Sequence, residues 1–267
     1  MAEIKVVING ALGRMGQQVA AAVAADPALE LAGAADSKAR GNQLIVPATD
    51  RQVPLYADTG TLLESCRADV LVDFSVAEAA LIAASLALKN GVNVVVGTTG
   101  LSDENLKEID KLARDKGKGA VVAANFAIGA VIMMHLAKIA AKYLDSAEII
   151  ELHHEKKLDA PSGTALATAR GMLKARGKPF IYAGTEKETL KGTRGGQNGG
   201  IAIHSVRLPG FVASQEVIFG ALGQTLTIRH DTVSRESFMP GVLLAIKEVS
   251  RRRGLVLGLD TLLNLGE

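Results

Sequence analysis

The segment ELHHEKKLDAPSGTAL (151–166) concentrates side chains that can bind ligands or transfer protons. Its paired histidines suggest a metal site, since imidazole is a common ligand of zinc and iron. Adjacent residues of a strand point to opposite faces, however, so His153 and His154 cannot bind one ion while the strand continues. Lys156 and Lys157 would also repel a metal ion, and the chain contains no H-E-x-x-H pattern. We therefore predict that no metal binds here.

An anionic ligand suits the same segment better. Ser162, Gly163 and Thr164 precede the stretch ALATARGML, so we expect them to begin a helix. The N–H groups at a helix start, together with two hydroxyl groups, can bind a carboxylate.

The residues before this helix start complete such a site. Lys157 can supply a positive charge and His154 a hydrogen-bond donor. His153 can deliver a proton, because histidine is the side chain that titrates nearest to neutral pH. The alternative is a capped helix that follows a solvated run of charges and binds nothing.

The stretch GALGRMG (10–16) follows an apolar run at 4–8 and precedes an Ala-rich helical segment. Its spacing, G-x-x-G-x-x-G, matches the dinucleotide-binding pattern only in part. In that role Gly10 turns the chain off the strand, Gly13 lets backbone approach a pyrophosphate, and Gly16 lets the helix pack on the sheet. A plain strand–helix turn with incidental glycines is the alternative.

Asp36 ends the second predicted strand, 20 residues after Gly16. A carboxylate at this place accepts hydrogen bonds from an adenosine ribose and repels a 2′-phosphate, which favours NAD. Arg14 and Lys38 lie close in sequence and can offset that repulsion. We therefore predict that the protein uses NADH, NADPH or both. The alternative is that Asp36 only caps a helix at the end of the strand.

Two more loops, GTTG (97–100) and AANF (123–126), follow apolar strands. In an open α/β sheet, loops at the carboxyl ends of the strands line the ligand crevice. Their small residues would let a flat nicotinamide lie against the backbone.

Positioning these residues requires two kinds of sheet. Up to residue 125, short apolar strands alternate with helices, among them one capped by Ser102, which predicts a Rossmann-like, doubly wound parallel α/β sheet. From 127 onward a long helix, a strand at 147–154, alternation at 200–209 and two strands within 214–231 predict a second, α+β domain with a mixed or antiparallel sheet.

Two local expectations concern the later part of the chain. The stretch KGTRGGQNGG (191–200) holds five glycines in ten residues and is expected to be a loop. A helix is expected over 236–254, with Ser237 as its N-cap because Pro240 fits only a first turn.

Composition excludes several classes of function. Among 267 residues the net charge is +2 and aromatics make up 3%, with no Trp, so a nucleic-acid partner is not expected. The single cysteine, Cys66, permits no intrachain disulfide. The apolar segment 126–144 contains Lys138 and Lys142 and reads as a buried helix rather than a membrane span. Without a recognisable secretory signal, we expect a cytoplasmic protein that does not engage membranes.

Over essentially its full length the sequence resembles the 4-hydroxy-tetrahydrodipicolinate reductase (dihydrodipicolinate reductase) family of bacterial lysine and diaminopimelate synthesis. The motifs that carry the resemblance are GALGRMG, VDFS, GTTG, AANF, ELHHEKKLDAPSGTAL and the run IHSVRLPG, QEVIFG, QTLTIRHD, SRESFMPG. The histidine–lysine–DAPSGT block is the most specific of them.

The resemblance implies an NAD(P)-binding domain of residues 1–126 with 236–267, and a substrate-binding and oligomerisation domain of residues 127–235, in a homotetramer. It implies that the cofactor is held by Gly10, Ala11, Leu12, Gly13, Arg14, Met15, Asp36, Gly97, Thr98, Thr99, Ala123, Ala124, Asn125 and Phe126.

It also implies that His153 is the proton donor and acceptor, that Lys157 is a second proton donor, and that His154, Gly163 and Thr164 bind the substrate. That substrate is a cyclic dicarboxylate, reduced by hydride transfer and protonation without a metal. The alternatives are another two-domain NAD(P) oxidoreductase, acting on an amino acid or sugar, and a dinucleotide-sensing protein without catalysis.

Overall fold

A computed structural model of the chain describes residues 3–265. The chain divides into two compact units. Unit 1 is the described part of Met1–Phe126 together with that of Phe238–Glu267, and unit 2 is Ala127–Ser237.

Unit 1 is built on an eight-stranded sheet with the order β13-β7-β6-β5-β1-β2-β4-β3. Its strands are β1 (Ile4–Asn9), β2 (Leu29–Ala35), β3 (Gln43–Ile45), β4 (Gln52–Tyr56), β5 (Val70–Asp73), β6 (Asn93–Val96), β7 (Gly119–Val122) and β13 (Gly254–Leu257). The pairings from β13 to β4 are parallel, and β3 is antiparallel to β4. The predicted doubly wound parallel sheet is confirmed.

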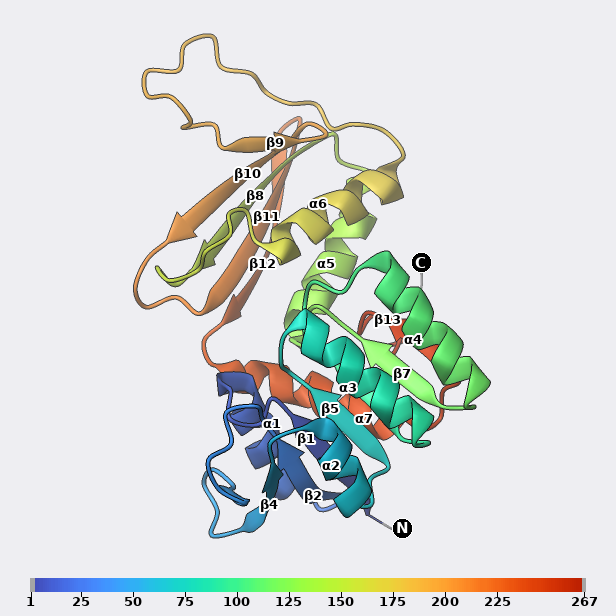
Figure 1. The fold of residues 1–267 in the computed structure, drawn as a ribbon. Coiled ribbons are helices and arrows are strands. Elements are labelled where there is room, and N and C mark those ends of the chain that lie inside the picture. Colours follow the sequence, from blue (N-terminus) through green and yellow to red (C-terminus); the bar gives the residue numbers. More distant parts are fainter. Residues whose placement is uncertain (1–2, 266–267) are drawn as a thin grey trace. The chain divides into compact units, whose positions relative to one another are not determined.

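Helices cover both faces of this sheet (Figure 1). They are α1 (Arg14–Ala25), α2 (Thr59–Ser65), α3 (Ala77–Lys89), α4 (Asp103–Asp115) and α7 (Met239–Val249). Helices α1 and α7 pack together on one face, whereas α2, α3 and α4 follow one another on the other. Because both faces are covered, the central strands are buried throughout and read as apolar runs. Helix α4 begins with the expected cap, in which the Ser102 side chain accepts from the Asn105 amide.

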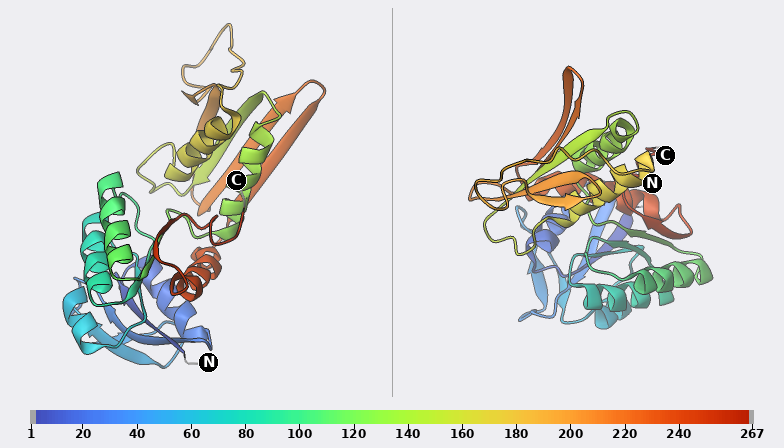
Figure 2. Two further views of the ribbon diagram at one scale, coloured as in Figure 1. Left: turned by 90° about the vertical axis from the view of Figure 1, so that its right-hand side faces the viewer. Right: turned by 90° about the horizontal axis from the view of Figure 1, so that it is seen from above.

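Unit 2 contains a five-stranded mixed sheet with the order β12-β11-β8-β10-β9. Its elements are α5 (Ile128–Ala141), β8 (Ser146–His153), α6 (Gly163–Arg176), β9 (Gly196–Asn198), β10 (Ile201–Arg207), β11 (Ala213–Ala221) and β12 (Gln224–Thr232). Strands β8 and β10 are parallel and the remaining pairings are antiparallel. Helices α5 and α6 lie on one face of this sheet (Figure 2), and the core forms between them and the strands. The predicted second domain with a mixed sheet is confirmed.

Three local predictions differ from the structure. Ser237 caps no helix, because it lies in a 3-10 turn, η1 (Arg235–Phe238), that runs directly into α7 and leaves no extended residue before it. The predicted helix ends at Val249, and a short apolar run after it becomes β13. The glycine-rich stretch contains β9, which pairs with β10 although its own residues carry no strand pattern.

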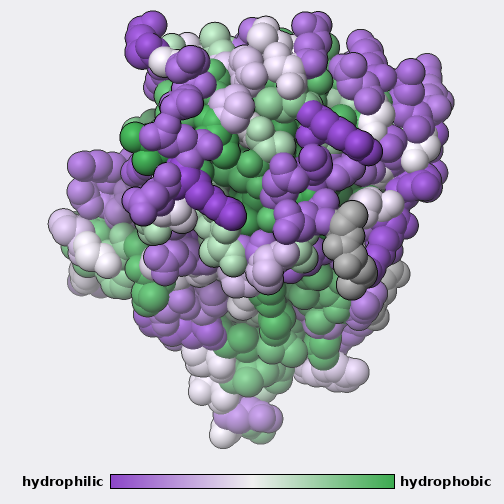
Figure 3. Space-filling view, turned by 90° about the horizontal axis from the view of Figure 1, so that it is seen from below, coloured by the Kyte–Doolittle hydropathy of each residue, from purple (hydrophilic) through white to green (hydrophobic). Residues whose placement is uncertain are grey.

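Large apolar side chains remain exposed on α5 and on the β11–β12 hairpin. They include Ile132, Leu136, Ile139 and Tyr143 on α5, and Leu222 and Leu226 on the hairpin. Figure 3 shows one face of the molecule, on which hydrophobic residues, in green, gather in the lower half. Within residues 3–265 no helix is both long and apolar enough to cross a membrane.

Candidate active site

The predicted cofactor loops lie at one edge of the unit 1 sheet. Strands β1, β2, β5, β6 and β7 run parallel, so the loops after them emerge at their common carboxyl edge. The structure therefore brings together every predicted cofactor residue of unit 1, on the loops Gly10–Gly13, Gly97–Thr99 and Ala123–Phe126, at Asp36, and on the first turn of α1.

The glycine-rich turn has the close packing that its spacing predicts. Gly10 has a φ of 78°, in the left-handed region, and a Cβ atom on Gly16 would lie 2.1 Å from the Gly10 carbonyl oxygen. No side chain caps the start of α1 at Gly13. The backbone N–H groups of this helix start are thus available to an anion such as a diphosphate.

Asp36 holds this turn in place. One carboxylate oxygen accepts from the Leu12 amide at 2.9 Å, and the other accepts from the Lys38 amide at 2.9 Å. Asp36 is buried, whereas the Arg14 and Lys38 side chains are exposed. Its carboxylate therefore shapes the loop, and each oxygen retains a second lone pair for a ligand hydroxyl.

A buried carboxylate that was not among the predicted site residues connects the ends of β1 and β5 with the loop after β6. Asp73, at the end of β5, is fully buried. It accepts from Asn9 Nδ2 at 2.6 Å, from Thr98 Oγ1 at 2.7 Å and from the Ser75 amide at 3.1 Å. Asn9 in turn accepts from Thr59 Oγ1 at 3.1 Å. The sequence signal was an acid at the end of the otherwise apolar run VLVD.

The segment 151–166 of unit 2 contains the predicted proton-transfer residues. His153 ends β8, and its Nδ1 lies 2.5 Å from Glu151 Oε2. The two side chains share a face because they are two residues apart on a strand. Glu151 is also bound by Arg207, from the neighbouring strand β10, through Nη1 at 2.9 Å and Nη2 at 2.7 Å.

Glu151 also accepts a hydrogen bond from the start of α6. The amide of Ser162 donates to Glu151 Oε1 at 3.2 Å, and the Ser162 hydroxyl caps α6 by accepting from the Ala165 amide at 3.2 Å. Burial opposes ionisation of this carboxyl group, but hydrogen bonds from His153 and Arg207 outweigh it and lower the pKa of Glu151 to about 2. Glu151 and Arg207 were both missed, although a Glu two residues before His153 on a strand was a usable signal.

The remaining predicted residues lie in the loop between β8 and α6 and in the first turn of α6. The Lys157 amide donates to the His154 carbonyl at 3.2 Å, which forms a turn. Lys157 Nζ donates to Asp159 Oδ1 at 2.7 Å, and this hydrogen bond lowers the pKa of Asp159. Gly163 is exposed and Thr164 half-buried at the first turn of α6. In the described chain no group of three or more His, Cys, Asp or Glu residues is arranged to hold a metal ion.

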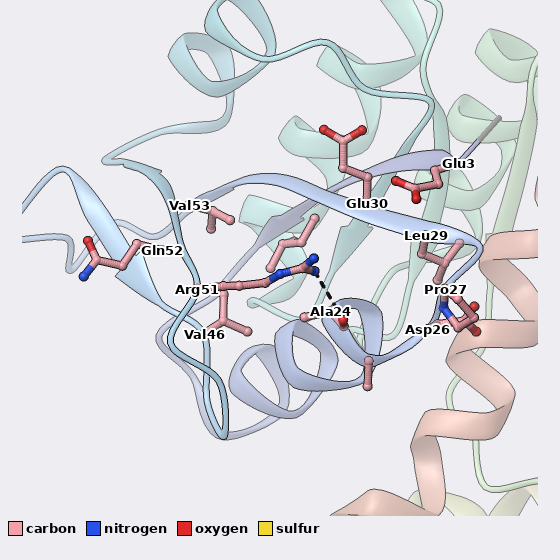
Figure 4. Close-up of a pocket in the computed structure, with 12 residues that line it drawn as sticks. Glu3, Ala24, Asp26, Pro27, Leu29, Glu30, Val46, Arg51, Gln52 and Val53 are labelled. Carbon is pink, nitrogen blue, oxygen red and sulfur yellow. Dashed lines mark hydrogen bonds between the residues drawn. The ribbon is translucent and has the colours of Figure 1, made fainter.

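A cavity of about 560 Å³ lies elsewhere in unit 1 (Figure 4). Glu3, Leu29 and Gln52 line it and stand at or just before the amino ends of β1, β2 and β4. Parallel strands place this edge opposite the glycine-rich turn, so the cavity is separate from the cofactor loops.

Comparison with known families covers both units. Residues 4–126 match the family model described as dihydrodipicolinate reductase, N-terminus, and residues 129–263 match that described as dihydrodipicolinate reductase, C-terminus. A curated relative, the 4-hydroxy-tetrahydrodipicolinate reductase of Dehalococcoides mccartyi, is 51% identical over 265 residues, which is 99% of this chain and 100% of the relative.

Solved structures agree. A dipicolinate-bound dihydrodipicolinate reductase from Paenisporosarcina sp. TG-14 has a TM-score of 0.86 and 42% identity, covering 97% of this chain and 99% of the other. An amine dehydrogenase from Mycobacterium smegmatis, 16% identical with a TM-score of 0.68 over 96% of this chain and 95% of its own, shares the fold alone. The matched models, the full-length relative and the shared motifs lead to one assignment: the chain belongs to the dihydrodipicolinate reductase family.

Proposed function

We propose that this chain reduces 4-hydroxy-tetrahydrodipicolinate to tetrahydrodipicolinate with NADH or NADPH, in lysine and diaminopimelate synthesis, and that His153 and Lys157 supply the protons. One observation carries the assignment of residues: His153 and the start of α6 both bind the same buried carboxylate, Glu151. A proton donor and an anion-binding helix start are thereby held next to each other, as a dicarboxylate substrate that must be protonated requires.

Unit 1 is the proposed cofactor-binding unit. The glycine-rich turn offers backbone N–H groups at an uncapped helix start, which suit a diphosphate. When bound, the reduced nicotinamide supplies a hydride. The residues proposed to hold it are Gly10, Ala11, Leu12, Gly13, Arg14, Met15, Asp36, Gly97, Thr98, Thr99, Ala123, Ala124, Asn125 and Phe126.

Both nucleotides are proposed to serve. Asp36 can accept a ribose hydroxyl, which suits NADH, although both of its oxygens already accept backbone amides. The exposed cations Arg14 and Lys38 can meet a 2′-phosphate, which suits NADPH.

Unit 2 is the proposed substrate-binding unit. Ser162, Gly163 and Thr164 present the α6 helix start to one carboxylate, while His154 and Lys157 present a donor and a charge. Loss of the 4-hydroxyl group as water gives a conjugated ring; hydride addition at C4 then leaves an enamine, and His153 gives it a proton. The reductase relative whose solved structure is described as dipicolinate-bound supports a cyclic dicarboxylate as ligand.

A homotetramer in the cytoplasm is the proposed state of the protein. The exposed apolar stripe of α5 and the long edge strand β12 support an assembly formed through unit 2.

Steady-state kinetics with freshly generated 4-hydroxy-tetrahydrodipicolinate test the proposal, with NADH and NADPH compared. We expect turnover with both nucleotides. In His153→Ala and Lys157→Ala, kcat should fall by about 10²-fold or more, because each variant removes a proton donor.

Nucleotide affinity, measured by fluorescence titration, should stay close to that of the parent chain. Lys156→Ala is the matched control, because Lys156 is exposed beside the half-buried Lys157, and it should keep its kcat. Nucleotide binding without turnover of this substrate would refute the activity, and a kcat loss in Lys156→Ala equal to that in Lys157→Ala would refute the assignment of Lys157.

A further inference from the structure

Glu151 and Arg207 form an ion pair, and the buried Glu151 carboxylate also contacts the His153 imidazole. The Glu151 side chain has no exposed surface, while the His153 and Arg207 side chains are 15% and 19% exposed. Arg207 binds both carboxylate oxygens of Glu151, and the oxygen at 2.9 Å from Nη1 also lies 2.5 Å from His153 Nδ1. The three side chains thus form a chain of contacts that ends at the imidazole.

Few charged groups surround the side chains of Arg207, Glu151 and His153. Strand β8 contributes Glu151 and strand β10 contributes Arg207, whose Nη2 also donates to the Asp159 carbonyl at 2.7 Å. The following loop carries the ion pair of Lys157 with Asp159. Opposite His153 on β11 stands Ala213, which has no charge. Glu151 is therefore the acidic group in hydrogen-bond contact with the imidazole.

We propose that Glu151 and Arg207 are positioning residues that orient His153 and set the pH range in which it can donate its proton. This inference rests on the proposed role of His153 as the proton donor. Glu151 accepts the Nδ1 proton, which leaves Nε2 as the nitrogen that faces the reaction. Arg207 offsets part of the Glu151 charge and so limits how strongly the carboxylate stabilises the imidazolium.

The state of Glu151 supports this arrangement. Its pKa, lowered to about 2, keeps the carboxylate ionised near neutral pH. An ionised carboxylate can only accept hydrogen bonds, so Nδ1 must carry the proton that lies between them. In general acid–base catalysis, a carboxylate that accepts a hydrogen bond from one imidazole nitrogen often holds the histidine in a single tautomer.

The two members of the pair predict opposite effects on the pH profile. A proton donor loses activity as pH rises, so the alkaline limb of kcat/KM reports it. Removing the carboxylate charge in Glu151→Gln destabilises the imidazolium and should move this limb down by about one pH unit. Removing the guanidinium in Arg207→Met leaves the carboxylate charge unopposed and should move the limb up, whereas Arg207→Lys should restore it.

The experiment is the pH dependence of kcat/KM for these variants at saturating nucleotide. We expect kcat of Glu151→Gln to fall about 10-fold, part of what a general acid contributes, with unchanged nucleotide affinity. Nitrogen-15 NMR of histidine-labelled protein, with His153→Asn used for assignment, should show the Nδ1–H tautomer in the parent chain and its loss in Glu151→Gln.

The double variant Glu151→Gln/Arg207→Gln serves as the control for misfolding, because it leaves no unpaired buried charge. If a single variant fails to fold, this double variant should still show the limb displaced to lower pH. Limbs that stay in place in folded variants would overturn the inference, because a merely structural pair lowers activity without moving them. Full activity in His153→Asn would instead refute the proposed role of His153 as the proton donor, so the two failures are distinguishable.

Discussion

At the scale of single residues, the buried carboxylate of Glu151 is the most consequential group in unit 2. Its ionisation is sustained by a bidentate guanidinium, an imidazole and a backbone amide, which together satisfy the charge inside the protein. Leaving such a charge without its partner costs about 3–5 kcal/mol, so each partner constrains the others. The residues proposed to position His153 are therefore also residues whose removal is expected to destabilise the fold.

This coupling predicts a loss of stability in acid. The pKa of Glu151 falls from 4.5 in the unfolded chain to about 2 in the folded one. Between these values the unfolded state binds more protons, so the contribution, about 3 kcal/mol, is complete above pH 4.5 and is lost as pH falls toward 2. Urea unfolding of the parent chain at pH 7, 4 and 3 should show this decline.

Glu151→Gln provides the comparison for that measurement. The difference in unfolding free energy between the parent chain and the variant should shrink as pH falls below 4.5. A difference that is constant over this range would mean that the ionised form of Glu151 does not stabilise the fold.

At the scale of elements, the contact between the β1–α1 turn and its own helix constrains the cofactor edge. A Cβ atom on Gly16 would meet the Gly10 carbonyl oxygen and the Ala11 backbone, at 2.1 Å and 2.7 Å. Backbone cannot give way as a flexible side chain can, so the turn and the helix can pack only around glycine.

Gly16→Ala is therefore expected to destabilise unit 1 by about 1–3 kcal/mol and to weaken nucleotide binding at least about 10-fold, because the displaced turn no longer presents its N–H groups. Thermal unfolding and nucleotide titration measure the two effects. Gly41→Ala is the matched control, since a Cβ atom there meets nothing within 4 Å, and it should leave both quantities unchanged. Unaltered nucleotide binding in Gly16→Ala would refute the role of the turn.

A buried hydrogen-bond network also connects the carboxyl ends of the strands of unit 1. Asp73 ties the ends of β1 and β5 to the loop after β6 through hydrogen bonds to Asn9 and Thr98. Three loops far apart in sequence thereby share one buried acceptor. Because a carboxylate can accept several hydrogen bonds at once, this network ties these strand ends and loops to one another.

At the scale of the whole molecule, the exposed apolar surface of unit 2 supports the proposed assembly. Helix α5 exposes Ile132, Leu136 and Ile139 at spacings of four and three residues, which form one stripe. Strand β12 is a nine-residue edge strand, and long edge strands of soluble proteins are usually covered.

We therefore expect Leu136→Lys to dissociate the proposed homotetramer, because it buries a charge without a partner at the subunit contact. Sedimentation velocity at micromolar concentration measures the change in mass. Val76→Lys, which alters an exposed apolar residue of unit 1, should leave the assembly intact. An assembly that persists unchanged in Leu136→Lys would exclude this face from the contact.

Local patterns in the sequence were enough to predict much of the fold. Apolar runs buried on both faces predicted the parallel strands, and Ser102 and Ser162 marked helix starts that the structure contains. Short or pattern-poor elements escaped prediction: β9 and β13 hold three and four residues and depend on the strands beside them. Ser237 failed as a cap because the preceding turn was itself helical.

The residue types and spacings of the sequence determined the candidate chemistry: a glycine turn for a diphosphate, a helix start for a carboxylate and a histidine for a proton. Only the tertiary structure revealed that Arg207 lies on Glu151, 56 residues away in sequence, and that Asp73 joins loops from three strands. Local periodicity reports which face a side chain occupies, whereas strand order decides which distant side chains meet on that face. The groups proposed to act could therefore be predicted from the sequence, whereas the groups that contact and position them became known only from the fold.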